Sequence, residues 1–399
     1  MSTWENNEEI KIFREYLQIP SVHPDIDYEP CVAFLKKQAQ NLGLPLKVYT
    51  PGGEKKPIVV ITWIGSNPEL PSIVLNSHMD VVPVFPNEWK HPPFGAEMDS
   101  EGRIFARGSQ DMKCVGMQHL AAIRALRKAG IQLKRTIHVT FVPDEELGGK
   151  PGMAMFVHTD DFKKLNVGFS LDEGIASATD VYPVYYAERF IIQIHFKISG
   201  TTGHGSLLHE NTAGVKLNHL LRKMMEFRQE EENKLKNNKN FTIGDVTTIN
   251  LTQIHGGVQS NVVPPMIEAV FDIRVAVTVD PDALIQKIEK FCEESGGGIE
   301  IEFEQKEPKV EPTKIDASNI YWTALKQAFD DAGIKTSTQV FPGATDSRYV
   351  RLVGIPAIGF SPMNNTPVLL HDNDEYLKAD TYLEGIEIYK KILKALANV

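Results

Sequence analysis

Histidines and carboxylates in this chain gather at the ends of short apolar segments. Ser77-His78-Met79-Asp80 closes one such segment, and Asp144-Glu145-Glu146 directly follows another. Loops at the ends of strands are where a scaffold presents ligands and catalytic groups. These residue types at these places predict a hydrolase that uses two metal ions.

His78 and Asp80 are two residues apart at the end of a predicted strand. In extended backbone, residues i and i+2 lie on one face, so the Asp80 carboxylate is expected to accept a hydrogen bond from the His78 ring. The other ring nitrogen would then bind a metal ion. A His-x-Asp triplet alone is more typical of a surface histidine beside a turn, and it is the motifs that follow that favour the ligand.

Asp111 lies in a segment that opens into a predicted helix, ARGSQDMKCVG. Glycines before and after it, Gly108 and Gly116, allow the backbone to present the carboxylate to a cation. One carboxylate can bridge two metal ions, and Asp111 is the candidate bridge. The alternative is an ordinary helix N-terminus with Asp111 as its cap or first-turn acid, and both interpretations can hold together.

Three adjacent acids follow the apolar residues 137–142, in VPDEELGG. One carboxylate of such a run can bind a metal while its neighbour holds the attacking water. Glu146 is the expected ligand and Glu145 the expected general base.

Two later motifs, Asp172-Glu173 and His371-Asp372, would complete two sets of nitrogen and oxygen ligands. Without cysteine among the ligands, such sets suit zinc best, with cobalt or manganese as substitutes.

The elements around these motifs change character along the chain. Residues 71–78 and 136–143 are compact apolar segments separated by a helical pattern at 117–129, as in βαβ units. From residue 189 the strands alternate strictly, with Ile192, Ile194, Phe196 and Ile198 on one side. Such strands indicate an antiparallel sheet with one solvated face.

The alternating part reads as a strand-helix-strand-strand-helix-strand module. Its further strands are expected at 247–254 and 267–277, and its helices at 213 to about 227 and 281–294, with 226–240 as a solvated helix end and loop. After it, a helix at 320–332, a buried strand at 355–360 and a helix at 382–397 return to the first pattern. We therefore predict a discontinuous α/β domain, 1–187 and 311–399, with an inserted domain at 188–310.

Composition excludes several classes of protein. The chain has 399 residues, 42% of them hydrophobic, and a net charge of -10, with no basic, aromatic-rich surface of the kind that binds nucleic acid. No apolar segment is long enough to span a membrane, and the first residues are not those of a signal peptide. Three widely spaced cysteines suit a reducing compartment. A cytoplasmic enzyme is expected.

Six motifs in order resemble one known family over about 300 residues of the chain: SHMDVVP, ARGSQDMK, VPDEELGG, the later DEG, GTTGHGS and HDNDE. They are similar to the co-catalytic zinc aminoacylases and metallopeptidases, a family that includes carboxypeptidases, dipeptidases and deacetylases. The resemblance implies a zinc-exopeptidase-like catalytic domain with a central mixed sheet. It also implies an inserted α+β, ferredoxin-like domain that serves as a lid and makes a homodimer.

The same resemblance assigns the metal ligands. It implies one zinc ion held by His78, Asp111 and Glu173, and a second held by Asp111, Glu146 and His371, two ions per subunit. Glu145 matches the general base, and Asp80 matches the acid that orients the first histidine. Glu173 is preferred to Asp172 because the family's ligand occupies the second acidic position of this loop.

In the inserted domain, His204 matches a histidine that reaches the partner subunit's active site and supports the oxyanion. Asn261, Arg274 and Arg348 match groups that hold the substrate's carboxylate or the developing oxyanion, a task that suits an arginine fork.

Within the family, the motifs are most similar to those of aminoacylases, so hydrolysis of small N-acyl-L-amino acids with neutral side chains is the expected function. The metal ligands alone leave a dipeptidase or carboxypeptidase open. A binding protein without catalysis is the remaining alternative, disfavoured because every ligand and the base are retained.

Overall fold

The computed structural model describes residues 4–399 and divides into two compact units. Unit 1 comprises the residues up to Tyr186 together with Thr313–Thr338 and Thr345–Val399, and unit 2 comprises Ala187–Pro312 and Gln339–Ala344. Two of the boundaries fall within strands, β8 (Tyr182–Glu188) and β15 (Thr336–Phe341). Each unit is described by itself.

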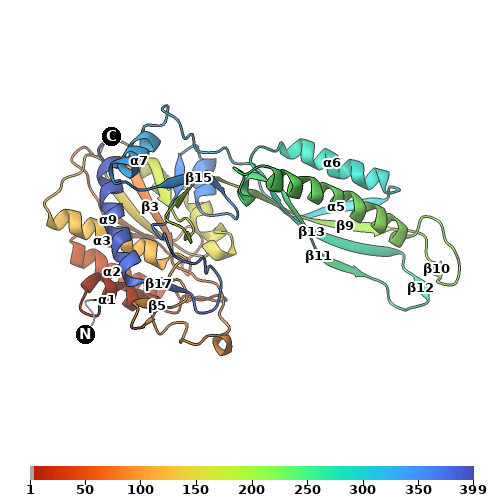
Figure 1. The fold of residues 1–399 in the computed structure, drawn as a ribbon, viewed down its shortest axis with the longest axis horizontal. Helices are drawn as coiled ribbons and strands as arrows, with labels where there is room; N and C mark the ends of the chain where they lie inside the picture. Colours follow the sequence, from red (N-terminus) through yellow and green to blue (C-terminus); the bar gives the residue numbers. More distant parts are fainter. Residues whose placement is uncertain (1–3) are drawn as a thin grey trace. The chain divides into compact units, whose positions relative to one another are not determined.

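A mixed sheet of eight strands forms the centre of unit 1 (Figure 1). Its order is β1-β2-β6-β3-β7-β16-β8-β15. The contiguous pairs β6–β3, β3–β7 and β7–β16 are parallel, whereas β1–β2, β2–β6 and β16–β8 are antiparallel. The other strands are β1 (Leu46–Tyr49), β2 (Ile58–Trp63), β3 (Ser72–His78), β6 (Ile137–Val142), β7 (Val167–Asp172) and β16 (Ala357–Gly359). The predicted α/β class and the strands expected at 71–78, 136–143 and 355–360 are confirmed.

Helices cover both faces of this sheet, because successive strand residues point to opposite sides. In β2, Val59 and Ile61 join one hydrophobic core and Ile58 and Val60 join the other. Helices packed on the larger core are α1 (Glu8–Leu17), α2 (Glu29–Leu42), α3 (Lys113–Lys128), α7 (Ile320–Asp331) and α9 (Ala379–Leu396), whereas α4 (Asp160–Lys164) and α8 (Ser347–Leu352) pack on the smaller. The helix expected at 320–332 is confirmed, and the one expected at 382–397 begins three residues earlier.

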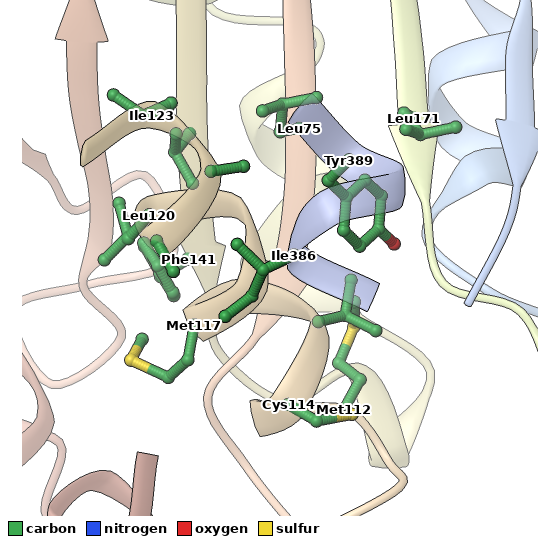
Figure 2. Close-up of a cluster of buried hydrophobic side chains, with 14 of the residues drawn as sticks. Leu75, Met112, Cys114, Met117, Leu120, Ile123, Phe141, Leu171, Ile386 and Tyr389 are labelled. Atoms are coloured by element: carbon green, nitrogen blue, oxygen red, sulfur yellow. The ribbon is translucent and has the colours of Figure 1, made fainter. Parts of the chain in front are cut away.

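Figure 2 shows side chains of α3 and α9 gathered over β3 in the larger core. Helix α3 begins at Lys113, four residues before the expected start at 117. Gly116 is therefore a helix residue, and its function is close packing: a Cβ there would lie 2.6 Å from Ser77 Oγ and 2.7 Å from Phe141 Cε1. The expectation that Gly116 loosens a loop after Asp111 was wrong, whereas Gly108 does have a positive φ of 86°.

A smaller sheet of three strands in unit 1 has the order β17-β5-β4. It pairs β17 (Tyr376–Lys378) with β5 (Arg103–Phe105), and β5 with β4 (Glu97–Met98), all antiparallel. This pairing brings the segment after His371 next to the segment before Asp111, although they are more than 250 residues apart in sequence.

Unit 2 contains a four-stranded antiparallel sheet with two helices. The strand order β11-β13-β9-β14 and the chain order strand-helix-strand-strand-helix-strand are those of a ferredoxin-like fold. The elements are β9 (Phe190–Ser199), α5 (Ala213–Asn237), β11 (Thr248–Gly256), β13 (Met266–Val275), α6 (Pro281–Glu294) and β14 (Ile299–Lys306). The predicted alternation of β9 is confirmed, since Ile192, Ile194, Phe196 and Ile198 are all in the core.

Helix α5 continues to Asn237, so the solvated helix end and loop expected over 226–240 is helix for most of its length. The extra turns are rich in glutamate and lysine, which are good helix formers. They are also anchored, because the half of α5 beyond 226 includes a buried Glu231 that accepts a hydrogen bond of 2.9 Å from Thr247 N.

Among residues 4–399, no helix combines the length and apolar character needed to cross a membrane. Cys31, Cys114 and Cys292 are buried free thiols.

A partly exposed histidine on β9 gives unit 2 a predicted pH dependence. His195 Nδ1 lies 3.0 Å from Glu268 Oε1, and Nε2 lies 3.0 Å from Glu304 Oε2. Hydrogen bonds to Glu304 and Glu268 raise the pKa of His195 above its ordinary value. Protonated His195 therefore stabilises the folded state. This stabilisation is complete below the unfolded pKa of about 6.5 and is lost as the pH rises through the higher folded pKa.

We expect His195→Gln to remove roughly 0.5 kcal/mol of stability at pH 5.5, as for other partly exposed ion pairs, and almost none at pH 9. Urea unfolding of the full chain at both pH values measures this difference. His219→Gln, on an exposed face of α5 in the same unit, is the control. An equal loss at both pH values in His195→Gln would show that the histidine contributes by packing alone.

Candidate metal centre

Three neighbouring parallel strands of unit 1 deliver site residues to one edge of the sheet. His78 is the last residue of β3, Glu145 and Glu146 follow β6, and Glu173 follows β7. The carboxyl ends of parallel strands meet at the same edge, where ligands of α/β sheets bind. The order and direction of the strands therefore bring these four residues together.

Asp111 and His371 come from loops, and they join the same cluster. Asp111 Oδ1 lies 3.1 Å from His78 Nε2, and Asp111 Oδ2 lies 3.2 Å from His371 Nε2. His371 Nε2 is also 3.3 Å from Glu146 Oε2, and Glu173 Oε1 is 3.7 Å from His78 Nε2. The two oxygens of Asp111 thus face two different histidines, as a bridging carboxylate requires.

Potential ligand atoms lie close enough to hold an ion in overlapping groups. His78, Asp111 and Glu146 form one group, and His78, Glu145 and Glu173 form another, with the atoms of each within 4.8 Å of one another. The alternative role for Asp111 as a helix cap was wrong, because the N-cap of α3 is Met112. Asp172 points elsewhere: its carboxylate accepts hydrogen bonds from Asn76 and Ser347, at 3.2 and 3.0 Å.

The electrostatics of the cluster fit divalent cations. Burial and the charge of Glu173 raise the pKa of Glu145, and burial and Asp111 raise the pKa of Glu146 and of Glu173. Hydrogen bonds to Asp111 and Glu146 raise the pKa of His371 to about 10. Asp111 differs, because hydrogen bonds to His371 and His78 lower its pKa. Three glutamates that favour protonation beside an imidazole that favours a positive charge mark a site short of positive charge, which metal ions would supply.

Asp80 contacts the cluster differently from the expectation. His78 Nδ1 donates to the backbone carbonyl of Asp80 at 2.8 Å, and the carboxylate lies 3.7 Å away. That carboxylate is fully buried and instead accepts hydrogen bonds from the backbone N–H groups of Glu145 and Glu146, at 3.1 and 3.0 Å. The predicted Asp80 side-chain bond to His78 was wrong, because these donors hold the carboxylate beneath the loop of Glu145.

This loop has an unusual backbone. Asp144 has a φ of 57°, a left-handed conformation that aspartate tolerates better than most residues. Its side chain accepts a hydrogen bond of 2.6 Å from Tyr28 OH and pairs with Lys56, and its N–H donates to Tyr28 OH at 3.0 Å. The turn held in this way directs the next two N–H groups at Asp80.

His23 is a site residue that the sequence analysis missed. It is 7% exposed, and its Nε2 lies 2.9 Å from Asp80 Oδ2. Fifty-seven residues separate the two in sequence, and nothing in the pattern around His23 signals the contact.

Of the other predicted site residues, Arg348 belongs to unit 1, and His204, Asn261 and Arg274 belong to unit 2. Arg348, on α8, donates to the carbonyl of Gly148 at 3.0 Å, just beyond the Glu145 loop. His204 and Asn261 come together in unit 2, where Gly205 N donates to Asn261 O at 2.8 Å beside the short ribbon of β10 (Gly203–His204) and β12 (Val262–Val263). Arg274, on β13, is paired with Asp272 through two hydrogen bonds of 2.8 and 3.1 Å.

Comparison with known proteins identifies the family. Residues 74–395 match the family described as "Peptidase family M20/M25/M40". The chain belongs to this family. Among its relatives, aminoacylase-1 of Mus musculus is 48% identical over 98% of this chain and 95% of its own length, and aminoacylase-1 of Dictyostelium discoideum is 43% identical over the full length of both. The resemblance to the aminoacylases is therefore confirmed, and the chain is an amidohydrolase.

Solved structures of the family share the fold. A metallo-carboxypeptidase of the M20 family from Sulfolobus solfataricus superposes with a TM-score of 0.75 at 18% identity, covering 98% of this chain and 99% of that one. A dinuclear metal-binding M20 peptidase from Bacillus subtilis has a TM-score of 0.69 at 15% identity, with 98% and 97% covered.

We predict that His23→Ala lowers kcat about tenfold, because it takes a donor from the buried Asp80 carboxylate that holds the Glu145 loop, and outer contacts of metal sites typically contribute 10–100-fold. His23→Gln keeps a donor at this position and should retain most activity. Steady-state kinetics of both variants checks the expectation, and an unchanged kcat in His23→Ala would contradict it.

Proposed function

We propose that this protein hydrolyses N-acyl-L-amino acids with neutral or hydrophobic side chains to a carboxylate and a free L-amino acid, using two zinc ions per subunit. The observation that carries the proposal is the Asp111 carboxylate, whose two oxygens face His78 and His371 at 3.1 and 3.2 Å. The aminoacylase-1 relatives support the substrate class, and the dinuclear metal named for the Bacillus subtilis peptidase supports the two ions.

His78, Glu173 and one oxygen of Asp111 would hold the first ion, and Glu146, His371 and the other oxygen of Asp111 the second. Their nitrogen and oxygen atoms suit zinc. Bound zinc would supply polarisation of the acyl carbonyl and would lower the pKa of water.

Glu145 is the proposed general base. Its carboxylate lies 4.0 Å from His78 Nε2 and is buried among the ligands, so it is close to any water held there. It would take a proton from the attacking water and return that proton to the leaving amine, with no covalent acyl-enzyme. Asp80, through the N–H groups of Glu145 and Glu146, keeps this carboxylate in position.

Residues of unit 2 are also proposed to take part in catalysis and in dimerisation. His204 would stabilise the oxyanion in the active site of the partner subunit, with unit 2 as both lid and dimerisation domain. Edge strand β11 and the loops near it expose Leu208, Ile254 and Val258, apolar surface of the kind that a subunit interface covers. Asn261, Arg274 and Arg348 would bind the substrate's carboxylate or the oxyanion, and for Arg274 this requires exchange of its partner Asp272.

We also propose a cytoplasmic location. The three buried cysteines are free thiols, which is typical of proteins in a reducing compartment.

Hydrolysis of N-acetyl-L-methionine tests the function. We expect release of methionine by the purified protein, loss of that activity on chelation and its return with zinc. Faster cleavage of a dipeptide with a free amino terminus than of its acetylated counterpart would favour a dipeptidase instead. Absence of hydrolysis of either substrate by the zinc-loaded protein would favour a binding protein.

Glu145→Ala separates the base from the ligands. We predict that it lowers kcat by about 10²–10⁴-fold, the usual contribution of a general base, while the protein still binds two zinc ions. Asp161→Ala, on the exposed surface of α4, is the control. Full turnover in Glu145→Ala would refute the assigned base.

His204→Ala tests the contribution of the partner subunit. The expected result is a loss of about 10²–10³ in kcat, typical of one oxyanion donor, with the dimer intact in sedimentation. His158→Ala, an exposed histidine of unit 1 just before α4, is the control and should be fully active. A fully active His204→Ala would remove the oxyanion role.

A further inference from the structure

We propose that Glu375, with Arg107, is a positioning residue that sets the site of Asp111, Glu146 and His371 without acting on His78 and Glu173. The inference rests on the proposed two-ion function and adds a residue to it. Glu375 is 0% exposed and lies four residues after His371.

The carboxylate of Glu375 gathers the loop that carries Asp111. Its Oε1 accepts hydrogen bonds from Gln110 N at 2.6 Å and Asp111 N at 3.3 Å, with Ser109 Oγ at 3.4 Å. Its Oε2 accepts one from Gly108 N at 3.1 Å. Four consecutive residues, ending in the bridging aspartate, thus converge on one buried anion.

Arg107 connects the same anion to His371. Its Nη1 donates to Glu375 Oε2 at 2.8 Å and to the carbonyl of Asp372 at 3.0 Å, and its Nη2 donates to the carbonyl of His371 at 3.3 Å. His371 has a φ of 62°, a backbone conformation that is unfavourable for a histidine and needs such support.

The Gln110 side chain adds a second connection between the two loops. Its amide nitrogen donates to the carbonyls of Pro367 and Tyr376, at 3.0 and 2.8 Å, and its oxygen accepts from Leu369 N at 3.1 Å. The segment with His371 is therefore held at both ends by the loop of Asp111.

His78 and Glu173 are positioned by other means, at the ends of β3 and β7 in the central sheet. A hydrogen bond of a buried carboxylate to an N–H group or a guanidinium is charge-assisted and strong, so neutralising Glu375 should loosen both loops. The ion held by Asp111, Glu146 and His371 would have two of its three ligands on loosened loops. The ion held by His78, Glu173 and Asp111 would have one, so its affinity should fall less.

The test is a zinc titration of the metal-free full chain in competition with a chromophoric chelator. We expect Glu375→Gln, which keeps the shape and loses the charge, to bind the ion of Asp111, Glu146 and His371 at least about tenfold more weakly, with a clearly smaller loss for the ion of His78 and Glu173. Cobalt-loaded protein should show the larger change in its visible spectrum for the more weakly bound ion. Asp99→Asn is the control, since it breaks an Asp–Arg pair of 2.6 Å to Arg103 beside the same small sheet, and it should leave both ions unchanged.

Two unchanged affinities in Glu375→Gln overturn the proposal. Equal weakening of both ions also overturns it, because that result indicates a general structural effect. If the metal-free Glu375→Gln protein lacks a cooperative thermal transition, Arg107→Lys is read by the same criteria, since it keeps a charge and loses the fork.

The parent protein separates this inference from the proposed function. Two bound ions without hydrolysis of N-acetyl-L-methionine would sink the substrate assignment and leave the role of Glu375 intact. Fewer than two ions in the parent would overturn both.

Discussion

The shared Asp111 carboxylate is the constraint around which the rest of unit 1 is arranged. Its oxygens face His78 and His371, so two loops and one strand end must be placed correctly at the same time. A bridging carboxylate tolerates little displacement, because moving it toward one histidine moves it away from the other. The sheet places one of these partners, and the interlocked loops around Glu375 place the other.

Each buried charge near the site is held by its own set of donors. Asp80 accepts hydrogen bonds from His23 and two backbone N–H groups. Glu375 accepts them from Arg107 and from N–H groups of the Asp111 loop, and Asp172 accepts them from Asn76 and Ser347. A buried carboxylate without donors would cost several kcal/mol, so these sets explain how so many acids are buried in one region. The cluster of His78, Asp111, Glu145, Glu146, Glu173 and His371 differs, since its members mainly face one another, an arrangement that divalent cations would stabilise.

The sequence predicted those features that depend on local pattern. Apolar segments before His78 and Glu145 predicted β3 and β6, and alternation predicted β9. A strand buried on both faces is apolar throughout, and a strand buried on one face alternates. The motif residues His78, Asp111, Glu146 and His371 are indeed neighbours in space. Their roles as zinc ligands came from the resemblance to the family and stay a proposal.

Features that depend on distant contacts could not be predicted in this way. His23 and Glu375 act through partners 57 and 264–268 residues away, and no local pattern records those pairings. The Asp80 carboxylate was assigned to the nearest histidine, although backbone N–H groups from another loop compete for it. The length of α5 was underestimated because polar residues that favour a helix also suit a loop.

Anomalous X-ray diffraction at the zinc edge, on crystals of the zinc-loaded protein, tests the central claim most directly. The account predicts two peaks about 3.5–4 Å apart on either side of the Asp111 carboxylate, one beside His78 and Glu173 and the other beside Glu146 and His371. A single peak, or two peaks that do not share Asp111, would contradict it.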